Sequence, residues 1–536
     1  MTELADNAVG ANWLIEQFGL QLIGDLPVHS RIGTRRTTTG TDIRHEIYLE
    51  AMRPADTPAA HLQFHLRHEV PHLELLSRLF AKSGPAFVQE WINSEPTGQY
   101  SRRAAFLYEW LTEDPLTPPE RLGGNYVDAL DDSKQVTASA HAVLKNSRWR
   151  VNDNMAGTRH FCPILIKTPA YAAAEGLDVK QLFTGLTEEF GEELLLRAAA
   201  WMTLRESKSS FIIEREGDRV SRIQRFADVM GRRTGEGQAP LTDEASAELQ
   251  REILGDVTTL AQFGFRKSPV FVGESVNHNE IVHYVAPVQD DVPAMMEGLR
   301  AFIERTQGQS PVMRSAVAAF GYVYIHPMAD GNGRVHRFLI NDVLRRDGVI
   351  PAPVILPVSA VITDDTAERR AYARVLDLVS APLMRNIREL YSFAQTRTTY
   401  PDGVVSNFEF QGCDTARPLW RYMDLTGHVQ YMSKIIERTV TEQMREESKY
   451  LRSHAVARSA LKEIIEMPDQ QADRLLRSIE QNKGVLSGVL KKEMPILEKP
   501  GLWDEIVEAV QTAFKNENPP DALVVERYHP AKPAGK

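Results

Sequence analysis

Helical periodicity dominates the hydrophobic pattern of this 536-residue chain. Apolar residues recur every three or four positions in stretches free of Pro and Gly breakers, which predicts amphipathic or buried helices. The helices are expected over residues 61–82, 102–112, 179–232, 242–254, 292–305, 311–325, 334–344 and 364–379. By contrast, 265–273 and 280–287 are β-branched or aromatic runs on either side of a turn-rich centre, which is typical of a hairpin. The pattern predicts a mainly α protein with one β-hairpin.

Breaks in this pattern divide the chain into four predicted regions. A loop-like stretch with several Gly and Asn residues separates two helical parts, and the C-terminal part is charged and amphipathic. We expect an N-terminal helical domain, a connector, a core and a C-terminal helical region over residues 1–122, 123–178, 179–395 and 396–536. Residues 472–490 read as helix, turn and helix, which could open a winged helix, and the Pro-rich tail after Asn516 is expected to be mobile.

Composition narrows the class of protein. Hydrophobic content of 43% and charged content of 25% are ordinary for a soluble globular chain. The net charge of −10 argues against bulk binding to nucleic acid or to an anionic membrane. Only two cysteines are present, and no apolar run approaches the roughly 20 residues of a membrane span, so a cytoplasmic protein without a disulfide framework is expected. The composition indicates no oligomeric state.

Residues 325–337, Ile-His-Pro-Met-Ala-Asp-Gly-Asn-Gly-Arg-Val-His-Arg, carry the most chemistry. Gly331 and Gly333 allow positive φ, so successive backbone N–H groups can form an anion nest. The following residues predict a helix whose N-terminal dipole would face that nest. Arg334 and Arg337, three apart, project from one side of this helix and can fork onto phosphate oxygens.

Two side chains of the same segment suit a reaction at a phosphate. Asp330 is the only acid there, and a hard carboxylate suits Mg²⁺ that bridges phosphates. His326 stands before the turn, and an imidazole can accept a hydroxyl proton near neutral pH. His336 is interpreted as structural. The segment therefore predicts a site for a nucleotide polyphosphate with a base beside it.

This segment resembles the Fic family motif, His-x-Phe-x-Asp/Glu-Gly-Asn-Gly-Arg-x-x-Arg. The resemblance implies transfer of AMP from ATP to a protein Ser, Thr or Tyr hydroxyl, with release of pyrophosphate and with Mg²⁺ as cofactor. It also implies roles for the matching residues: His326 as general base, Asp330 as Mg²⁺ ligand, Gly331, Asn332 and Gly333 as the anion hole, Arg334 on the phosphates and Arg337 on the γ-phosphate. Met328 replaces the usual Phe, and we expect it to fill the same apolar space.

Members of the family often carry an inhibitory helix that reads Ser/Thr-x-x-x-Glu-Gly/Asn. Ser210 and Glu214 match this pattern within residues 207–216, at i and i+4 on one helix face. The resemblance implies that Glu214 bonds Arg337 where a γ-phosphate would otherwise sit. Arg215 departs from the pattern because it replaces Gly or Asn. An ordinary charged surface helix is the other interpretation of this stretch.

The predicted hairpin near 265–287 lies where the resemblance places a flap that clamps a target segment by strand addition. Val282, His283 and Tyr284 are the expected docking residues. A plain structural hairpin is the alternative.

The resemblance implies a Fic-type helical core with a β-hairpin flap, flanked by helical N- and C-terminal domains. The leading hypothesis is a protein adenylyltransferase that is autoinhibited by Glu214 and acts with ATP on an unidentified protein target or on itself. One alternative is a nucleotide-sensing regulator whose flanking domains bind protein or DNA. Another is a Fic enzyme that removes AMP or uses another nucleotide.

Overall fold

The computed structural model describes residues 7–216, 219–276 and 279–515, and it is mainly helical, as the sequence predicts. The chain divides into two compact units. Unit 1 comprises Met1–Gln181 and Met202–Thr439, and unit 2 comprises Leu182–Trp201 and Val440–Lys536. Residues 182–201, which the sequence pattern assigns to the core, therefore group with the C-terminal part.

The N-terminal part of unit 1 contains a small sheet that the helical prediction missed. Its strand order is β1-β3-β2, with β1 parallel to β3 and β2 antiparallel to it. Its strands and the helices beside them are β1 (Val28–Gly33), β2 (Thr37–Thr39), β3 (Arg44–Leu49), α1 (Ala11–Phe18), α2 (Pro58–His68), α3 (Leu73–Ser83), α4 (Ala86–Ser94) and α5 (Gln99–Thr112). The helical stretch expected over 61–82 is broken at Pro71, as that residue predicts, and it forms two helices, the second capped by His72.

The expected connector packs onto this N-terminal part. It contains the three-stranded sheet β4-β6-β5 and one helix, with bounds β4 (Val127–Asp128), β5 (Leu144–Asn146), β6 (Val151–Asp153) and α6 (Pro169–Glu175). Trp149 is fully buried, and Trp149, Val151 and Ile164 belong to the same hydrophobic core as Leu62 and Phe106. The segment is therefore irregular in backbone yet part of the packed core.

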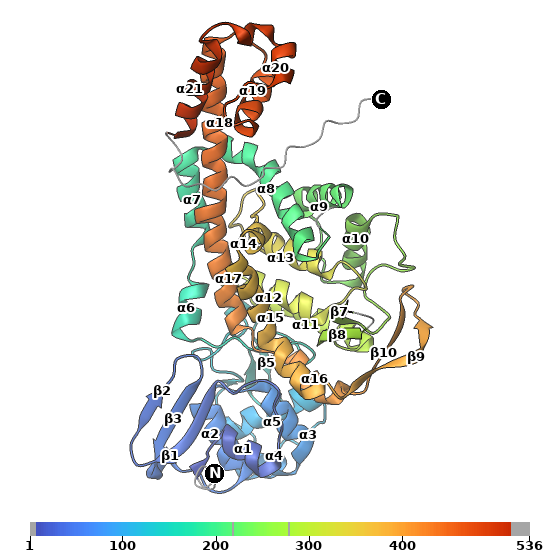
Figure 1. Cartoon of the computed structure of the whole chain (residues 1–536). Helices are drawn as coiled ribbons and strands as arrows, with labels where there is room; N and C mark the ends of the chain where they lie inside the picture. Colours follow the sequence, from blue (N-terminus) through green and yellow to red (C-terminus); the bar gives the residue numbers. More distant parts are fainter. Residues whose placement is uncertain (1–6, 217–218, 277–278, 516–536) are drawn as a thin grey trace. The chain divides into compact units, whose positions relative to one another are not determined.

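A group of helices forms the centre of unit 1 (Figure 1). They are α8 (Glu192–Ile213, of which 202–213 belong to this unit), α9 (Val220–Arg233), α10 (Asp243–Leu254), α11 (Val292–Arg305), α12 (Pro311–Ile325), α13 (Asn332–Arg346), α14 (Val358–Asp364), α15 (Thr366–Ile387), α16 (Cys413–Arg421) and α17 (Thr426–Arg438). α12 and α13 are buried along most of their length. The loop between them is therefore held by the best-packed helices of the unit.

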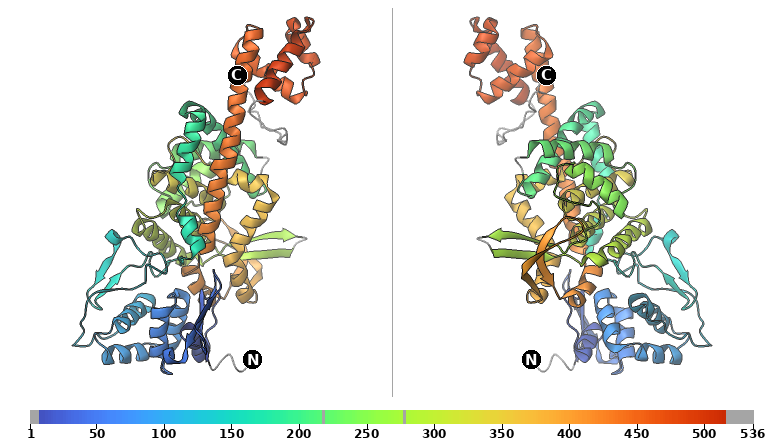
Figure 2. Two further views of the ribbon diagram at one scale, coloured as in Figure 1. Left: turned by 90° about the vertical axis from the view of Figure 1, so that its left-hand side faces the viewer. Right: turned by 90° about the vertical axis from the view of Figure 1, so that its right-hand side faces the viewer.

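Two sheets of unit 1 consist of a single two-stranded hairpin each. β7 (Phe271–Val276) pairs antiparallel with β8 (Asn279–Val285), as expected, and this hairpin projects from the helices in Figure 2. Residues 277–278 of the expected flap lie outside the described residues. The second hairpin, β9 (Tyr391–Thr399) with β10 (Val405–Phe410), was not predicted. Phe393 and Phe408 contact Phe271 of β7 at ring-centroid distances of 5.5 and 4.9 Å, so the two hairpins share an aromatic cluster.

The described residues of unit 2 are helical. Its elements are α7 (Val179–Phe190), a π-helical segment (Thr439–Met444), α18 (Arg445–Ile464), α19 (Asp469–Gln481), α20 (Gly488–Glu493) and α21 (Leu502–Lys515). The first residues of α7 and of the π-helical segment belong to unit 1. Leu461, Leu476 and Val510 lie in its core. α19 and α20 are the expected helix, turn and helix, while residues 440–515 contain no strand for a wing. The tail expected to be mobile after Asn516 lies outside the described residues.

Short 3₁₀ turns occur at Glu50–Met52, Ala140–Ala142, Gln289–Asp291 and Pro495–Glu498. Among the described residues, no helix is both long enough and apolar enough to span a membrane.

Candidate active site

The loop 326–331 joins α12 to α13 and carries the first half of the sequence motif, while the second half lies in α13. α12 ends at His326, which caps it in the left-handed conformation with φ of 52°. Pro327 follows and cannot continue the helix. Gly331, with φ of 92°, is the N-cap of α13, and this conformation favours glycine. Two left-handed residues thus set the loop between two buried helices.

The N-terminus of α13 is built to receive an anion. Gly331 has no side chain to cap the helix, and the first intrahelical bond is donated by Val335 to the Gly331 carbonyl at 3.0 Å. The N–H groups of residues 332–334 precede that bond, at the positive end of the helix dipole. Asn332, which the family resemblance assigns to the anion hole, has its backbone N–H at the start of α13. Its side chain is buried and bonds the backbone N–H and carbonyl of Met328 at 2.9 and 2.7 Å, so it braces the loop.

His326 is anchored through one of its ring nitrogens. Its Nδ1 lies 3.2 Å from the Val323 carbonyl, which places the hydrogen on Nδ1 and the lone pair on Nε2. Burial, and then the nearby Arg266 guanidinium, lower the pKa of His326 to about 4. The imidazole is therefore neutral at physiological pH and can accept a proton at Nε2.

Glu214 contacts both arginines of the motif. Arg337 Nη2 donates to its Oε1, and Arg334 Nε lies 3.1 Å from its Oε2, within ion-pair distance though without the angle of a hydrogen bond. Arg337 Nε also donates to Ser210 Oγ at 2.6 Å. The arginine side chains are 4–5% exposed and that of Glu214 is 22% exposed. A Cβ on Gly333 would lie 2.5 Å from Glu214 Oε1, so glycine is needed there to admit the carboxylate.

The end of α8 explains the family preference for Gly or Asn at the position of Arg215. The Glu216 N–H donates to the Phe211 carbonyl at 2.8 Å, and the Arg215 N–H donates to the Ile212 carbonyl at 3.0 Å. These two bonds form a Schellman motif, which requires a left-handed residue. Arg215 takes that conformation with φ of 62°, and its exposed guanidinium bonds Glu274 of β7 at 2.8 Å. Arg215 therefore does not prevent Glu214 from reaching the arginines.

Asp330 lies at the edge of an open pocket. Its side chain is 55% exposed and lies 3.2 Å from Arg334 Nη2, while its carbonyl accepts a bond from Gln250 of α10 at 2.8 Å. The pocket has a volume of about 300 Å³, within the range of small-molecule sites. It is lined by Arg222, Leu254, Val257, Thr258, Thr259, Asp330 and Arg334.

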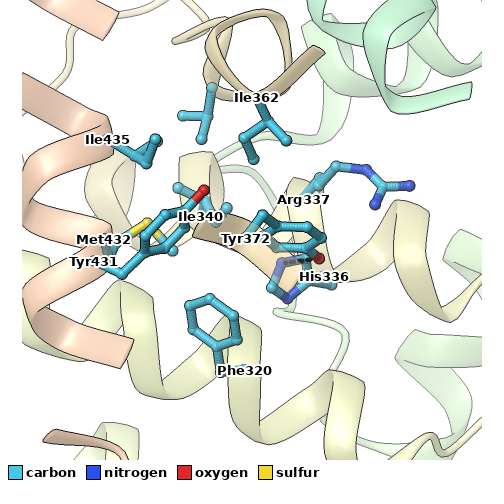
Figure 3. A pocket seen from close by; sticks show the side chains of 10 residues that line it. Phe320, His336, Arg337, Ile340, Ile362, Tyr372, Tyr431, Met432 and Ile435 are labelled. Carbon is cyan, nitrogen blue, oxygen red and sulfur yellow. Dashed lines mark hydrogen bonds between the residues drawn. The ribbon is translucent and has the colours of Figure 1, made fainter. Parts of the chain in front are cut away.

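The aliphatic part of the Arg337 side chain packs among apolar residues on the side away from Glu214. It lines an apolar cavity with room for about one water, and its guanidinium points away from that cavity (Figure 3). His336 is buried and its Nδ1 lies 2.7 Å from the Ala319 carbonyl, in agreement with a structural role. Burial lowers the pKa of His336 to about 3, so this ring is neutral and adds no charge beside Arg337.

The hairpin places only part of the expected docking set at the surface. His283 is exposed, with 55% of its side chain accessible, and Val282 is half-buried. Tyr284 is a correction: it is 5% exposed, and its hydroxyl donates to the Tyr324 carbonyl of α12 at 2.8 Å. Side chains alternate along a strand, so Tyr284 points inward and anchors β8 instead of contacting a target.

Sequence reasoning missed two residues that hold the loop. Gln250 bonds the Asp330 carbonyl and accepts from the Gly264 N–H at 2.8 Å, and Arg266 bonds the His326 carbonyl at 2.8 Å. No local pattern identifies either contact, because the partners lie 14 to 80 positions apart.

Comparisons with known proteins agree with this geometry. Residues 240–344 match the sequence profile of the Fic/DOC family. Protein adenylyltransferase Fic of Drosophila grimshawi is 36% identical over 112 residues, which cover 20% of this chain and 21% of that protein. The Drosophila melanogaster protein of the same name is 34% identical over 112 residues, 20% of each chain. The chain thus spans about a fifth of the length of these relatives.

A Fic family protein from Desulfovibrio desulfuricans G20 is a similar solved structure, with 18% identity, a TM-score of 0.38, and coverage of 62% of this chain and 89% of that one. The matched residues hold the loop 326–331, the N-terminus of α13 and the β7–β8 hairpin. This chain therefore contains a Fic/DOC family domain, distantly related to protein adenylyltransferase Fic over that region.

Proposed function

We propose that this protein is a Mg²⁺-dependent adenylyltransferase that moves AMP from ATP to a Ser, Thr or Tyr hydroxyl of a protein. The observation that carries the proposal is the pairing of an uncapped helix N-terminus with a neutral histidine at the other end of the same short loop. The first suits phosphate oxygens, and the second suits a hydroxyl proton. The distant relationship to proteins named as adenylyltransferases supports AMP as the transferred group.

The residues divide the reaction between them. The N–H groups at the start of α13 would bind phosphate oxygens, with Arg334 and Arg337 behind them. Nε2 of His326 takes the proton of the target hydroxyl, whose oxygen then bonds the α-phosphorus. The bond from that phosphorus to the β-phosphate oxygen breaks, and pyrophosphate leaves. Positioning and charge stabilisation dominate such transfers, so fixed N–H groups and buried arginines suit the task.

The donor set near the motif fits Mg²⁺. Asp330 offers an exposed carboxylate beside the start of α13, and Mg²⁺ is commonly held by one or two carboxylates together with substrate phosphates and waters. Among the described residues no group of three or more His, Cys, Asp or Glu could hold a metal by itself. When bound, Mg²⁺ would neutralise charge on the phosphates.

Glu214 would restrain this activity. Its carboxylate lies against both Arg334 and Arg337, the groups that the phosphates of ATP would need. A γ-phosphate and a carboxylate cannot share Arg337 without strong repulsion. ATP would then bind in a pose that leaves the α-phosphorus misaligned with the incoming hydroxyl.

The variant His326→Ala tests the proposal directly. It removes the base but leaves α13, Asp330 and both arginines in place. We expect transfer of α-phosphate label to fall by about 10²–10⁴-fold, while ATP affinity measured by calorimetry changes little.

The matched control is His336→Ala, which removes a buried histidine of the same motif that does not face the loop. The labelling rate of His336→Ala should fall only in proportion to any decrease in its folded fraction. Labelling by His326→Ala at more than half the wild-type rate would rule out the assignment of His326 as base.

A further inference from the structure

Arg266 is a buried cation without an acidic partner. It is 1% exposed and follows Phe265 in the segment that leads into β7. Among the described residues no carboxylate lies within ion-pair distance of its guanidinium. Burial lowers the pKa of Arg266 to about 10, while the nearby charge of Asp402 opposes this effect. Burying an unpaired charge is unfavourable, so its place in the fold needs a compensating role.

The guanidinium makes three hydrogen bonds, and all three acceptors are backbone carbonyls. Its Nε donates to the His326 carbonyl at 2.8 Å, its Nη1 to the Ser268 carbonyl at 2.9 Å, and its Nη2 to the Pro287 carbonyl. The Arg266 backbone N–H also donates to the Pro327 carbonyl at 2.8 Å. One side chain thus ties the start of β7, the residues after β8 and the catalytic loop together.

The contact from Arg266 to His326 is made where the backbone adopts an unfavourable left-handed conformation. A left-handed conformation is unfavourable for a residue with a Cβ, and His326 has φ of 52°. Such a conformation persists only when its surroundings hold it. The two bonds from Arg266, to the His326 and Pro327 carbonyls, hold both peptides that follow the ring.

We propose that Arg266 is a positioning residue for His326, fixing the left-handed turn that aims Nε2 at the reacting hydroxyl. The proposal rests on the role of His326 as general base. The proposal also implies that one guanidinium holds both the β7–β8 hairpin and His326. The distance between the hydroxyl presented by the hairpin and the base that accepts its proton is then fixed.

A residue outside the matched domain supports the same segment. Asp402, in the turn between β9 and β10, is 2% exposed. Its Oδ2 accepts from the Lys267 N–H at 2.7 Å and from Ser268 Oγ at 2.8 Å. The second hairpin therefore fixes the two residues that follow Arg266. The residue that provides this support lies outside residues 240–344, which match the family profile.

The positive charge of Arg266 acts on the ring as well. Arg266 is the charged group that contributes to the lowered pKa of His326, after burial. Burial raises the pKa of Tyr284 on β8 and of Tyr324 on α12, so both phenols stay neutral. Geometry and charge can therefore be separated by two substitutions. Arg266→Lys keeps the charge and loses the forked donors, whereas Arg266→Gln loses the charge and keeps a donor.

The experiment is an NMR titration of histidine-labelled full-length protein, with the His326 signal assigned from His326→Ala. In wild type, His326 should stay neutral down to about pH 4. In Arg266→Gln its midpoint should rise by about one pH unit, and in Arg266→Lys it should stay near the wild-type value. The same variants then provide pH profiles of α-phosphate label transfer. Arg266→Gln should move the acid limb upward, and Arg266→Lys should lower the rate by about 10-fold or more at every pH.

Three results would overturn the proposal: a wild-type His326 midpoint near 6.5, unchanged midpoints with full activity in both variants, or equal shifts in both. Where Arg266→Gln fails to fold, Arg266→Lys still decides, because the proposal requires its rate of transfer to fall while its His326 midpoint stays near the wild-type value. If wild-type protein and Glu214→Gly transfer no label, the proposed function fails, while the titration still tests whether Arg266 acts on His326.

Discussion

Replacing Glu214 by glycine removes a carboxylate that contacts both motif arginines. Arg337 keeps its bond to Ser210 Oγ at 2.6 Å, so its side chain should stay oriented with Nη2 released. A hydrogen bond to a charged group contributes about 1.5–3 kcal/mol, and the ion pair with Arg334 lacks hydrogen-bond geometry and should add less. A total near 3 kcal/mol corresponds to about a 10²-fold gain in the rate of transfer, at roughly 1.4 kcal/mol per factor of ten.

The assay is the initial rate of α-phosphate label transfer from Mg²⁺-ATP to the protein itself or to added protein. Glu216→Gly is the matched control, because Glu216 lies two positions on and pairs with Arg222 at 3.7 Å instead of with the motif. Its rate should equal that of wild type. The gain in Glu214→Gly should disappear when Arg337→Ala is added, because the freed guanidinium is then missing.

Equal rates for wild type and Glu214→Gly, with both proteins folded, would refute the reasoning. The end of α8 would then be a structural helix terminus whose carboxylate only neutralises buried arginines.

Three further changes follow from the same structure. Arg215→Gly should raise the free energy of unfolding by up to about 1 kcal/mol, because glycine accepts the left-handed conformation and the lost pair with Glu274 is exposed and weak; a lower Tm would contradict this. Glu206 is fully buried against Ser359, and burial raises its pKa to about 7, above the 4.5 of an ordinary Glu, so folding stability should fall as pH rises from about 4.5 to 7. Glu206→Gln should lack that decline and be more stable than wild type at pH 8 by on the order of 2 kcal/mol. Urea unfolding of both proteins at pH 5 and pH 8 would check this, and parallel pH dependences of their stability would exclude the assigned role of Glu206. Asp330→Ala should lose nearly all transfer and any response to added Mg²⁺ while its Tm stays within a few degrees, since its side chain is exposed; an active, metal-independent variant would contradict its role.

Local sequence patterns predict many of the helices and the β7–β8 hairpin. The bounds of α11 and α12 match their predicted ranges, because Pro starts each helix within its first turn and apolar residues follow at helical spacing. The β7–β8 hairpin was readable from its β-branched and aromatic runs. The contact between Glu214 and Arg337 joins positions 123 apart and was reached only through the family pattern, which residue periodicity alone could not supply.

Other features could have been read and were missed. The turn Pro401-Asp402-Gly403 between two strand-like runs signals the β9–β10 hairpin. Strand alternation would have turned Tyr284 inward once His283 was placed outward. The parallel pairing of β1 with β3 and the contacts of Arg266 depend on tertiary packing between distant segments, and no local signal in a single sequence specifies them.

The most direct test of the central proposal is a reaction of Glu214→Gly with Mg²⁺ and ATP labelled separately at the α- and γ-phosphorus, followed by intact-protein mass spectrometry. Adenylyl transfer predicts that α-label becomes covalent on protein with the mass of AMP, that γ-label leaves as pyrophosphate, and that adding His326→Ala lowers both by about 10²-fold or more. Protein that gains γ-label, or binds ATP without any covalent adduct in the presence of candidate targets, would contradict it.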